Sequence, residues 1–101
     1  MGKTPELQIV PEMTEVELSL DNIEAALKRD LGSSAMLIVR GDVIGGNMTK
    51  PHVYIIWRQG ERYNTHCAIY DASTNRWSFA WGHYNMSFEK AVEDFRDRNG
   101  N

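Results

Sequence analysis

Residues 52–85 constrain the fold of this chain more than any other stretch, because they hold all three tryptophans and all four tyrosines. They divide into three runs, 52–59, 62–70 and 76–84, in which alternate residues are apolar. An alternation with a period of two is typical of a β-strand with one face toward a core. The turn-forming stretches 59–61 and 71–75 separate the runs, which predicts two hairpins.

The alternation also assigns side chains to faces. In the first strand, Val53, Ile55 and Trp57 share one face. In the third, the same reasoning places four residues on one face, Trp77, Phe79, Trp81 and His83, and four on the other, Ser78, Ala80, Gly82 and Tyr84. The register between the strands stays open, because a change of one residue in a loop exchanges the faces.

A fourth strand precedes these three. Residues 36–39 read Met-Leu-Ile-Val, a continuous apolar run that is typical of a strand buried on both faces. We expect this strand to continue through 43–44, with Gly41 and Asp42 forming a bulge or turn. The sequence therefore predicts a four-stranded antiparallel β-meander over about residues 35–84.

Two helices flank the predicted meander. Residues 21–31 have a helical apolar stripe, with Asp21 as the expected cap and Gly32 as the stop. Residues 14–20 fit either a short strand or an extension of this helix. The second helix is expected over 87–98, with its phenylalanine stripe on the face that carries Trp77. The predicted fold class is therefore α+β.

The chain of 101 residues suits one domain, which we expect over 14–101, and residues 1–13 read as a flexible arm. No stretch reaches the ~18 apolar residues of a membrane span, and no apolar signal-peptide core is present near Met1. These features predict a cytoplasmic protein without a membrane partner.

Charge is uneven along the chain. Residues 1–34 hold seven acidic and three basic side chains, whereas 35–86 hold three acidic and five basic ones. The basic excess is too small for the strong electrostatic footprint of a dedicated nucleic-acid binder. The net charge of −3 is likewise too small for an acidic mimic of DNA.

Catalytic and metal chemistry find little support. His66 and Cys67 are neighbours in a strand and point to opposite faces, so they cannot form a dyad with each other. A single cysteine excludes an internal disulfide and a CxxC zinc site, and His52 and His83 lack ligand-like spacing. The glycine-rich stretch 41–46 matches no phosphate-binding loop. We therefore expect no enzyme activity, no cofactor and no metal.

With catalysis and metal binding set aside, we expect one face of the sheet to be a surface that recognises a partner. If the C-terminal helix covers the tryptophan face, the opposite face is left with aromatic and basic side chains of the types that anchor protein interfaces. The expected partner-binding residues are Tyr54, Arg58, His66, Tyr70, Arg76 and Tyr84. The alternative is that helix 21–31 covers this face and that its small residues let the helix approach.

Residues 77–95 read WSFAWGHYNMSFEKAVEDF, an aromatic strand that leads through a Gly/Tyr turn into a helix. This segment resembles the C-terminal part of small accessory proteins encoded by phages and plasmids. The resemblance implies a host-directed binding role, such as the inhibition of a defence system by anti-CRISPR or antirestriction proteins. It implies no catalytic residues.

The leading hypothesis is a non-enzymatic module that binds a host protein or complex and blocks its functional surface. The alternatives are a nucleic-acid-associated protein that uses the mildly basic sheet, and a hydrolase built on Cys67. A homodimer through an exposed first or last strand also remains open.

Overall fold

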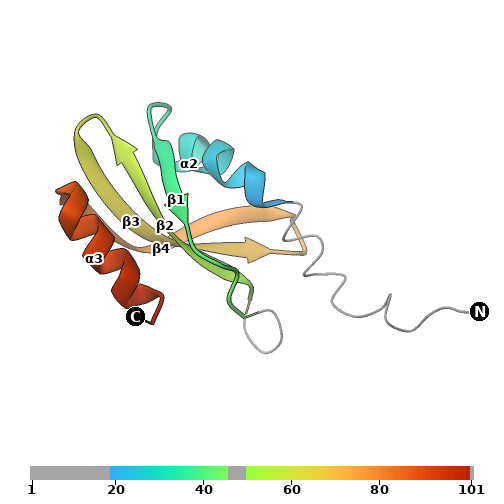
Figure 1. Ribbon diagram of the computed structural model, residues 1–101. Helices are drawn as coiled ribbons and strands as arrows, with labels where there is room; N and C mark the ends of the chain where they lie inside the picture. Colours follow the sequence, from blue (N-terminus) through green and yellow to red (C-terminus); the bar gives the residue numbers. More distant parts are fainter. Residues whose placement is uncertain (1–18, 46–49, 101) are drawn as a thin grey trace, which may run out of the picture.

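The computed structural model describes residues 19–45 and 50–100, and it has the predicted α+β architecture (Figure 1). The elements follow in the order η2 (Leu20–Asn22), α2 (Ile23–Leu31), β1 (Met36–Arg40), β2 (His52–Gln59), β3 (Arg62–Asp71), β4 (Arg76–Met86) and α3 (Phe88–Arg98). The arm expected over 1–13 and most of the open segment 14–20 lie outside the described residues, as do residues 46–49 of the glycine-rich loop.

The four strands form one antiparallel sheet in the order β1-β2-β3-β4, which confirms the predicted meander. Gln59 pairs with Arg62, so the first hairpin turns on two residues, and Gly60 supplies the positive φ of 63° that this turn needs. In the second turn, the carboxylate of Asp71 accepts a hydrogen bond of 3.0 Å from the backbone N–H of Ser73. Both turns therefore follow from their residue types.

Helix α2 packs on one face of the sheet. Ile23, Ala26 and Leu27 are buried there. They meet side chains from three strands, Val53, Ile55, Trp57, Ala68, Tyr70 and Trp77. The Nε1–H of Trp77 also donates a hydrogen bond of 2.9 Å to the carbonyl of Ser19. This face, called the α2 face below, contains the main core.

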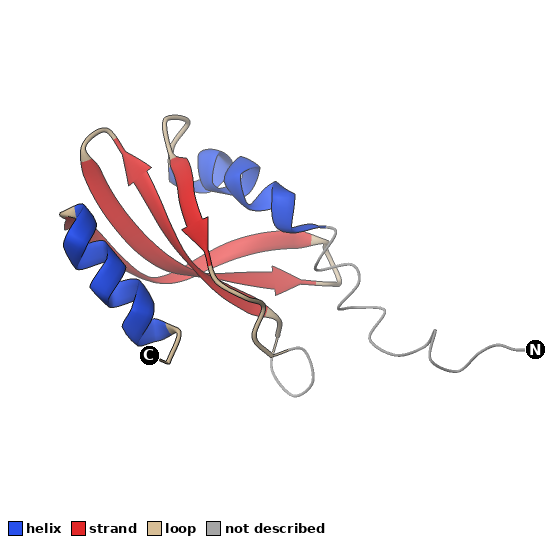
Figure 2. Cartoon of the chain, viewed as in Figure 1, coloured by secondary structure: helices blue, strands red, loops and turns tan. Residues whose placement is uncertain are grey.

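Helix α3 covers the opposite face, called the α3 face (Figure 2). Ser87 caps the helix, because its Oγ accepts a hydrogen bond of 3.2 Å from the backbone N–H of Lys90. Phe88 packs edge-on against Tyr63 with 5.2 Å between ring centroids. The prediction that the phenylalanine stripe lies on the Trp77 face was therefore wrong, since Trp77 belongs to the α2 face.

Two β-bulges in β4 explain why the predicted faces fail. Cys67 pairs with Ala80 and Thr65 with His83, so Trp81 and Gly82 together lie opposite one residue of β3. A second irregularity follows before the pairing of Tyr63 with Met86. Beyond the first bulge the alternation changes phase. Trp81 and His83 consequently leave the face of Trp77 and lie on the α3 face, which corrects the face assignment.

Two smaller expectations also change. The helix begins at Ile23 after a 3₁₀ turn, and neither Asp21 nor Asn22 provides a side-chain cap there. Gly32 ends the helix as predicted, at a φ of 140°. Strand β1 ends at Arg40. Beyond it, the backbone N–H of Gly41 donates a hydrogen bond of 2.8 Å to the carbonyl of Tyr54, and Ile44 forms an isolated bridge with His52.

Candidate functional site: a groove beside Trp81

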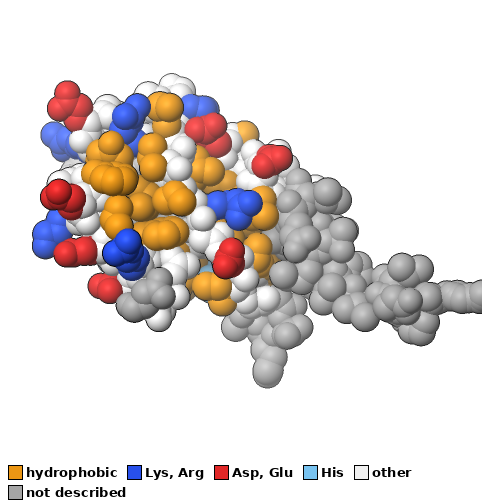
Figure 3. Space-filling view, in the orientation of Figure 1, with side chains coloured by type: hydrophobic (Ala, Val, Ile, Leu, Met, Phe, Trp, Pro, Cys, Tyr) orange, Lys and Arg blue, Asp and Glu red, His pale blue; other side chains and the backbone are white. Residues whose placement is uncertain are grey.

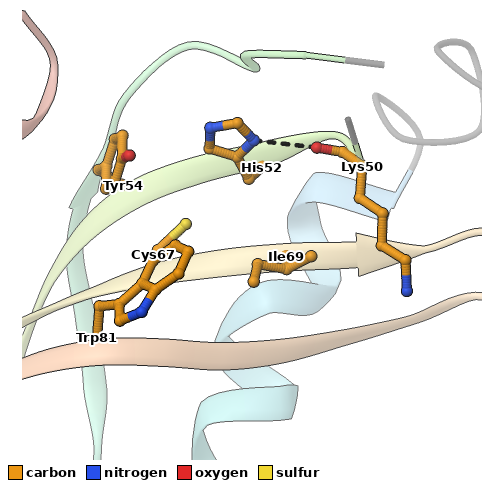
Figure 4. Close-up of a pocket in the computed structure, with 6 residues that line it drawn as sticks. All are labelled: Lys50, His52, Tyr54, Cys67, Ile69 and Trp81. Atoms are coloured by element: carbon orange, nitrogen blue, oxygen red, sulfur yellow. Dashed lines mark hydrogen bonds between the residues drawn. The ribbon is translucent and has the colours of Figure 1, made fainter. Parts of the chain in front are cut away.

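A groove of about 380 Å³ opens on the α3 face, where three strands contribute to its walls (Figure 4). Strand β2 and the residues before it supply one side, β3 supplies the floor, and β4 supplies the other side. The lining side chains are Lys50, His52, Tyr54, Cys67, Ile69 and Trp81. We call this feature the Trp81 groove.

Trp81 is the most unusual residue of the groove. Its side chain is 70% exposed, and its backbone has a φ of 53° in the left-handed region. A bulky side chain rarely adopts this conformation, which costs about 1–2 kcal/mol outside glycine, asparagine and aspartate. The second bulge of the same strand places Asn85 at a φ of 64°, a residue type that tolerates it. The exposed tryptophan is therefore held where a tolerant residue would be more stable.

The floor of the groove is apolar. Ile69 and the buried thiol of Cys67 form it, and Figure 4 shows both side chains between the walls of β2 and β4. Burial raises the pKa of the Cys67 thiol, although the nearby charge of Arg98 acts in the opposite direction. A thiol with a raised pKa is a poor nucleophile. His66 lies on the other face, as predicted, and cannot activate it.

The β2 wall consists of two aromatic rings. His52 and Tyr54 meet edge-to-face with 5.7 Å between their centroids. The Nδ1 atom of His52 lies 3.0 Å from the carbonyl oxygen of Lys50, which fixes the orientation of the imidazole ring (Figure 4). The Lys50 ammonium lies 3.7 Å from Oδ2 of Asp71 and remains largely exposed. The Lys50 cation therefore lies at one end of a groove that has aromatic walls and an apolar floor.

Helix α3 holds the other end of this wall in place. The guanidinium of Arg98 lies over the Tyr54 ring, 5.9 Å from its centroid. Asp94 Oδ2 accepts a hydrogen bond of 2.5 Å from Thr65 Oγ1, and the same oxygen forms an ion pair with Arg98, whose Nε lies 3.1 Å away. His83 Nδ1 lies 2.9 Å from Asp94 Oδ1. Burial acts to raise the pKa of Asp94, but the hydrogen bonds from Thr65 and His83 and the charge of Arg98 lower it overall.

The residues that the sequence predicted for partner binding do not share one surface. His66 and Tyr70 are 3% and 1% exposed, in the core of the α2 face. Tyr84 lies on that same face but is 53% exposed. Its hydroxyl lies 2.9 Å from Nε2 of His66.

Of the other three, Tyr54 lies in the Trp81 groove. Arg58 lies toward the β1 edge, with its Nη2 atom 3.4 Å from the sulfur of Met36. Arg76 is exposed at the start of β4. Sequence reasoning missed Trp81, His52 and Lys50. The only local signal was Gly82, since a glycine inside a strand often marks a bulge.

A second apolar area lies on the face shown in Figure 3, where hydrophobic side chains gather near β1 and α3. On β1, Met36, Ile38 and Val39 are 39–44% exposed. The backbone N–H of Leu37 at this edge already donates a hydrogen bond of 2.9 Å to Oε2 of Glu24. That amide is therefore not available to pair with a second copy of the strand.

Within residues 19–45 and 50–100, no three His, Cys, Asp or Glu side chains lie close enough together to hold a metal ion. None of the helices described is of a length and hydrophobicity that would let it span a lipid bilayer. In comparisons with known proteins, no family model matches the chain, and neither a curated protein nor a solved structure shows significant similarity to it.

Proposed function

We propose that the protein is a non-enzymatic protein-binding module and that the Trp81 groove is its binding surface. The observation that carries the proposal is Trp81 itself, 70% exposed at a φ of 53°. Both the exposure and the backbone strain are unfavourable for the isolated domain. Tryptophan is also the residue type most enriched among the energetic anchors of protein interfaces.

The composition of the groove supports binding rather than chemistry. Its single thiol has a raised pKa, and its imidazole, His52, is directed to a backbone carbonyl rather than to the thiol. The network of Asp94, His83 and Thr65 has its carboxylate in the centre. A hydrolytic triad would instead need a histidine between the carboxylate and the hydroxyl.

In this proposal the protein acts by covering a functional surface of its partner. Together with the resemblance of residues 77–95 to phage and plasmid accessory proteins, this suggests an inhibitor of a host defence complex. An infection assay tests that role: cells with an active CRISPR or restriction system should become more permissive to phage when they express the protein. The variant Trp81→Ala should lose this effect.

The binding proposal has a direct test. Immobilised full-length protein is used to capture partners from a host lysate, and Trp81→Ala is compared with Phe88→Ala, which removes an aromatic ring that is 49% exposed on α3. Trp81→Ala should weaken the complex about 30-fold or more, as expected for an anchor worth at least ~2 kcal/mol. Phe88→Ala should have little effect. Equal binding by both variants would contradict the proposal.

Nucleic acid is the competing ligand, and salt distinguishes it. A complex that depends on phosphate contacts loses affinity steeply between about 50 and 200 mM salt. The complex proposed here should persist over that range and should resist nuclease treatment. A nuclease-sensitive complex would favour the alternative, in which the basic side chains of the sheet contact a nucleic acid.

A further inference from the structure

The chemistry of the Trp81 groove restricts what its partner presents. The floor is made of Cys67 and Ile69, and the walls are the rings of Trp81 and Tyr54. A thiol is only a weak hydrogen-bond donor, so a polar group placed on this floor would lose its bonds to water without replacement. The group that enters the groove is therefore apolar.

The size of the groove adds a second restriction. A volume of about 380 Å³ is near the lower end of the range of about 300–1,000 Å³ for small-ligand pockets. It accommodates one large side chain and leaves the rest of a partner segment outside. An extended segment is the form of polypeptide that presents single side chains in this way.

Charge supplies a third restriction. Of the residues that the structure describes, Lys50 is the one charged side chain that lines the groove, and its ammonium lies 3.7 Å from the carboxylate of Asp71. The other nearby cation, Arg98, is already engaged by the carboxylate of Asp94. A partner group that meets Lys50 is therefore favoured if it is a carboxylate, provided that it lies at the rim.

Two other ligand classes fit less well. Three rings around a groove can form a cage for a quaternary ammonium group. Here the guanidinium of Arg98 already lies over Tyr54, and Lys50 adds a second positive charge. A single nucleic-acid strand would stack on Trp81, but it would need cations along successive phosphates, and among the described residues that line the groove Lys50 is the one Lys or Arg side chain.

We infer that the Trp81 groove binds an extended protein segment that inserts one large aromatic or branched side chain between Trp81 and Tyr54 and places a carboxylate on Lys50. This inference rests on the proposed function, since it names the chemistry of the same binding surface. It assigns separate roles to two residues: Trp81 provides contact area and Lys50 provides charge selection.

Nuclear magnetic resonance offers an internal control for the test. The indole N–H groups of Trp57 and Trp77 are buried and donate to His66 and Ser19, whereas Trp81 is exposed. The three indole signals therefore report the groove and the core separately, and Trp81→Ala identifies the signal of the groove. The probes are N-acetyl-phenylalanine, its uncharged amide, N-acetyl-aspartate, N-acetyl-trimethyllysine and an oligothymidylate.

N-acetyl-phenylalanine should move the Trp81 signal at the lowest concentration and leave the other two indoles in place. The amide should need a concentration about two- to fivefold higher to move the same signal, because it lacks the carboxylate and one exposed ion pair has about this effect on affinity. In the Lys50→Glu variant, N-acetyl-phenylalanine should bind no more tightly than its uncharged amide binds to the natural protein. Lys90→Glu is the matched control, because Lys90 is also exposed and lies 3.8 Å from a carboxylate, on α3. Lys90→Glu should leave the affinity for N-acetyl-phenylalanine unchanged.

The inference is overturned if the amide or N-acetyl-aspartate binds as well as the acid, if trimethyllysine or the oligothymidylate binds better, or if all three indoles move together. The proposed function is judged separately by partner capture. If N-acetyl-phenylalanine does not shift the indole signal of Trp81 while Trp81→Ala still abolishes partner capture, the inferred ligand chemistry is wrong and the proposed function stands. If the Trp81→Ala variant also captures the partner as well as the natural protein does, the inference and the proposed function are both wrong.

Discussion

The indole Nε1–H of Trp57 donates a hydrogen bond of 2.9 Å to Nδ1 of His66 in the buried part of the α2 face. An indole nitrogen only donates, so Nδ1 of His66 must be unprotonated and the ring proton must lie on Nε2. That nitrogen then donates to the hydroxyl oxygen of Tyr84, 2.9 Å away. A neutral imidazole of one defined tautomer thus joins two aromatic side chains, Trp57 and Tyr84.

This arrangement predicts a pH dependence of stability. Burial lowers the pKa of His66 to about 4, with smaller contributions from the charges of Arg98 and His83. In the unfolded chain the pKa is near 6.5. Below that value the unfolded chain takes up a proton that the folded one does not. Neutral His66 therefore contributes fully to the free energy of unfolding above about pH 6.5. As the pH falls from there toward 4, the free energy of unfolding decreases by roughly 2–3 kcal/mol.

Urea denaturation at a series of pH values between 4 and 7 measures this effect. His66→Gln should flatten the dependence, even though it also lowers the stability at neutral pH. His83→Gln, which changes an exposed imidazole on the α3 face, serves as the control. A slope that persists unchanged in His66→Gln would assign the protonation to another group.

Gly82 makes room for this cluster. A Cβ at this position would lie 2.6 Å from Cε1 of His66 and 2.7 Å from the hydroxyl oxygen of Tyr84. Because the imidazole is buried and bonded to Trp57, we expect it not to move freely. Gly82→Ala should lower the free energy of unfolding by about 1–3 kcal/mol.

Gly60→Ala is the comparison, because at a φ of 63° it is strained but has nothing within 4 Å. It should cost about 1 kcal/mol, the usual penalty of a left-handed backbone. Equal losses of stability in the two variants, measured by urea denaturation, would mean that the close approach to His66 is unimportant.

The sequence predicted the fold because local signals agreed with one another. Alternation predicted strands β2, β3 and β4, glycine and aspartate predicted the turns, and the phenylalanine stripe predicted helix α3. These features depend on neighbouring residues. Strand order followed in turn, since short hairpin loops place consecutive strands side by side.

The candidate site was not predicted, because it depends on one bulge. Strict alternation placed Trp81 with Trp77, and the additional residue opposite His66 places it on the α3 face instead. Nothing in the local sequence except Gly82 distinguishes a regular strand from a bulged one. Tyr84 is also moved to the other face by the bulge and lies on the α2 face beside His66. The tyrosines therefore do not form the single surface that was expected.

Asp94 links α3 to the sheet, and its removal should loosen the helix. Its carboxylate accepts a hydrogen bond from Thr65, which is fully buried, and forms an ion pair with Arg98. Asp94→Asn keeps the shape but removes the charge, so it should lower the free energy of unfolding by about 1–2 kcal/mol. Asp97→Asn, an exposed position on the same helix, should have an effect within about 0.5 kcal/mol. Similar losses in both variants, measured by urea denaturation, would contradict the role of Asp94.

Replacement of Trp81 should reveal a conflict between stability and binding. Trp81→Asn and Trp81→Ala both remove the ring from the groove, so both should lose partner binding. They differ in the backbone, because asparagine tolerates a φ of 53° and alanine does not. Trp81→Asn should therefore be more stable than Trp81→Ala by about 0.5–1 kcal/mol in urea denaturation, and at least as stable as the natural chain. If the alanine variant is as stable as the asparagine variant, the backbone at Trp81 is unstrained, and this tryptophan carries no energetic cost that binding would have to offset.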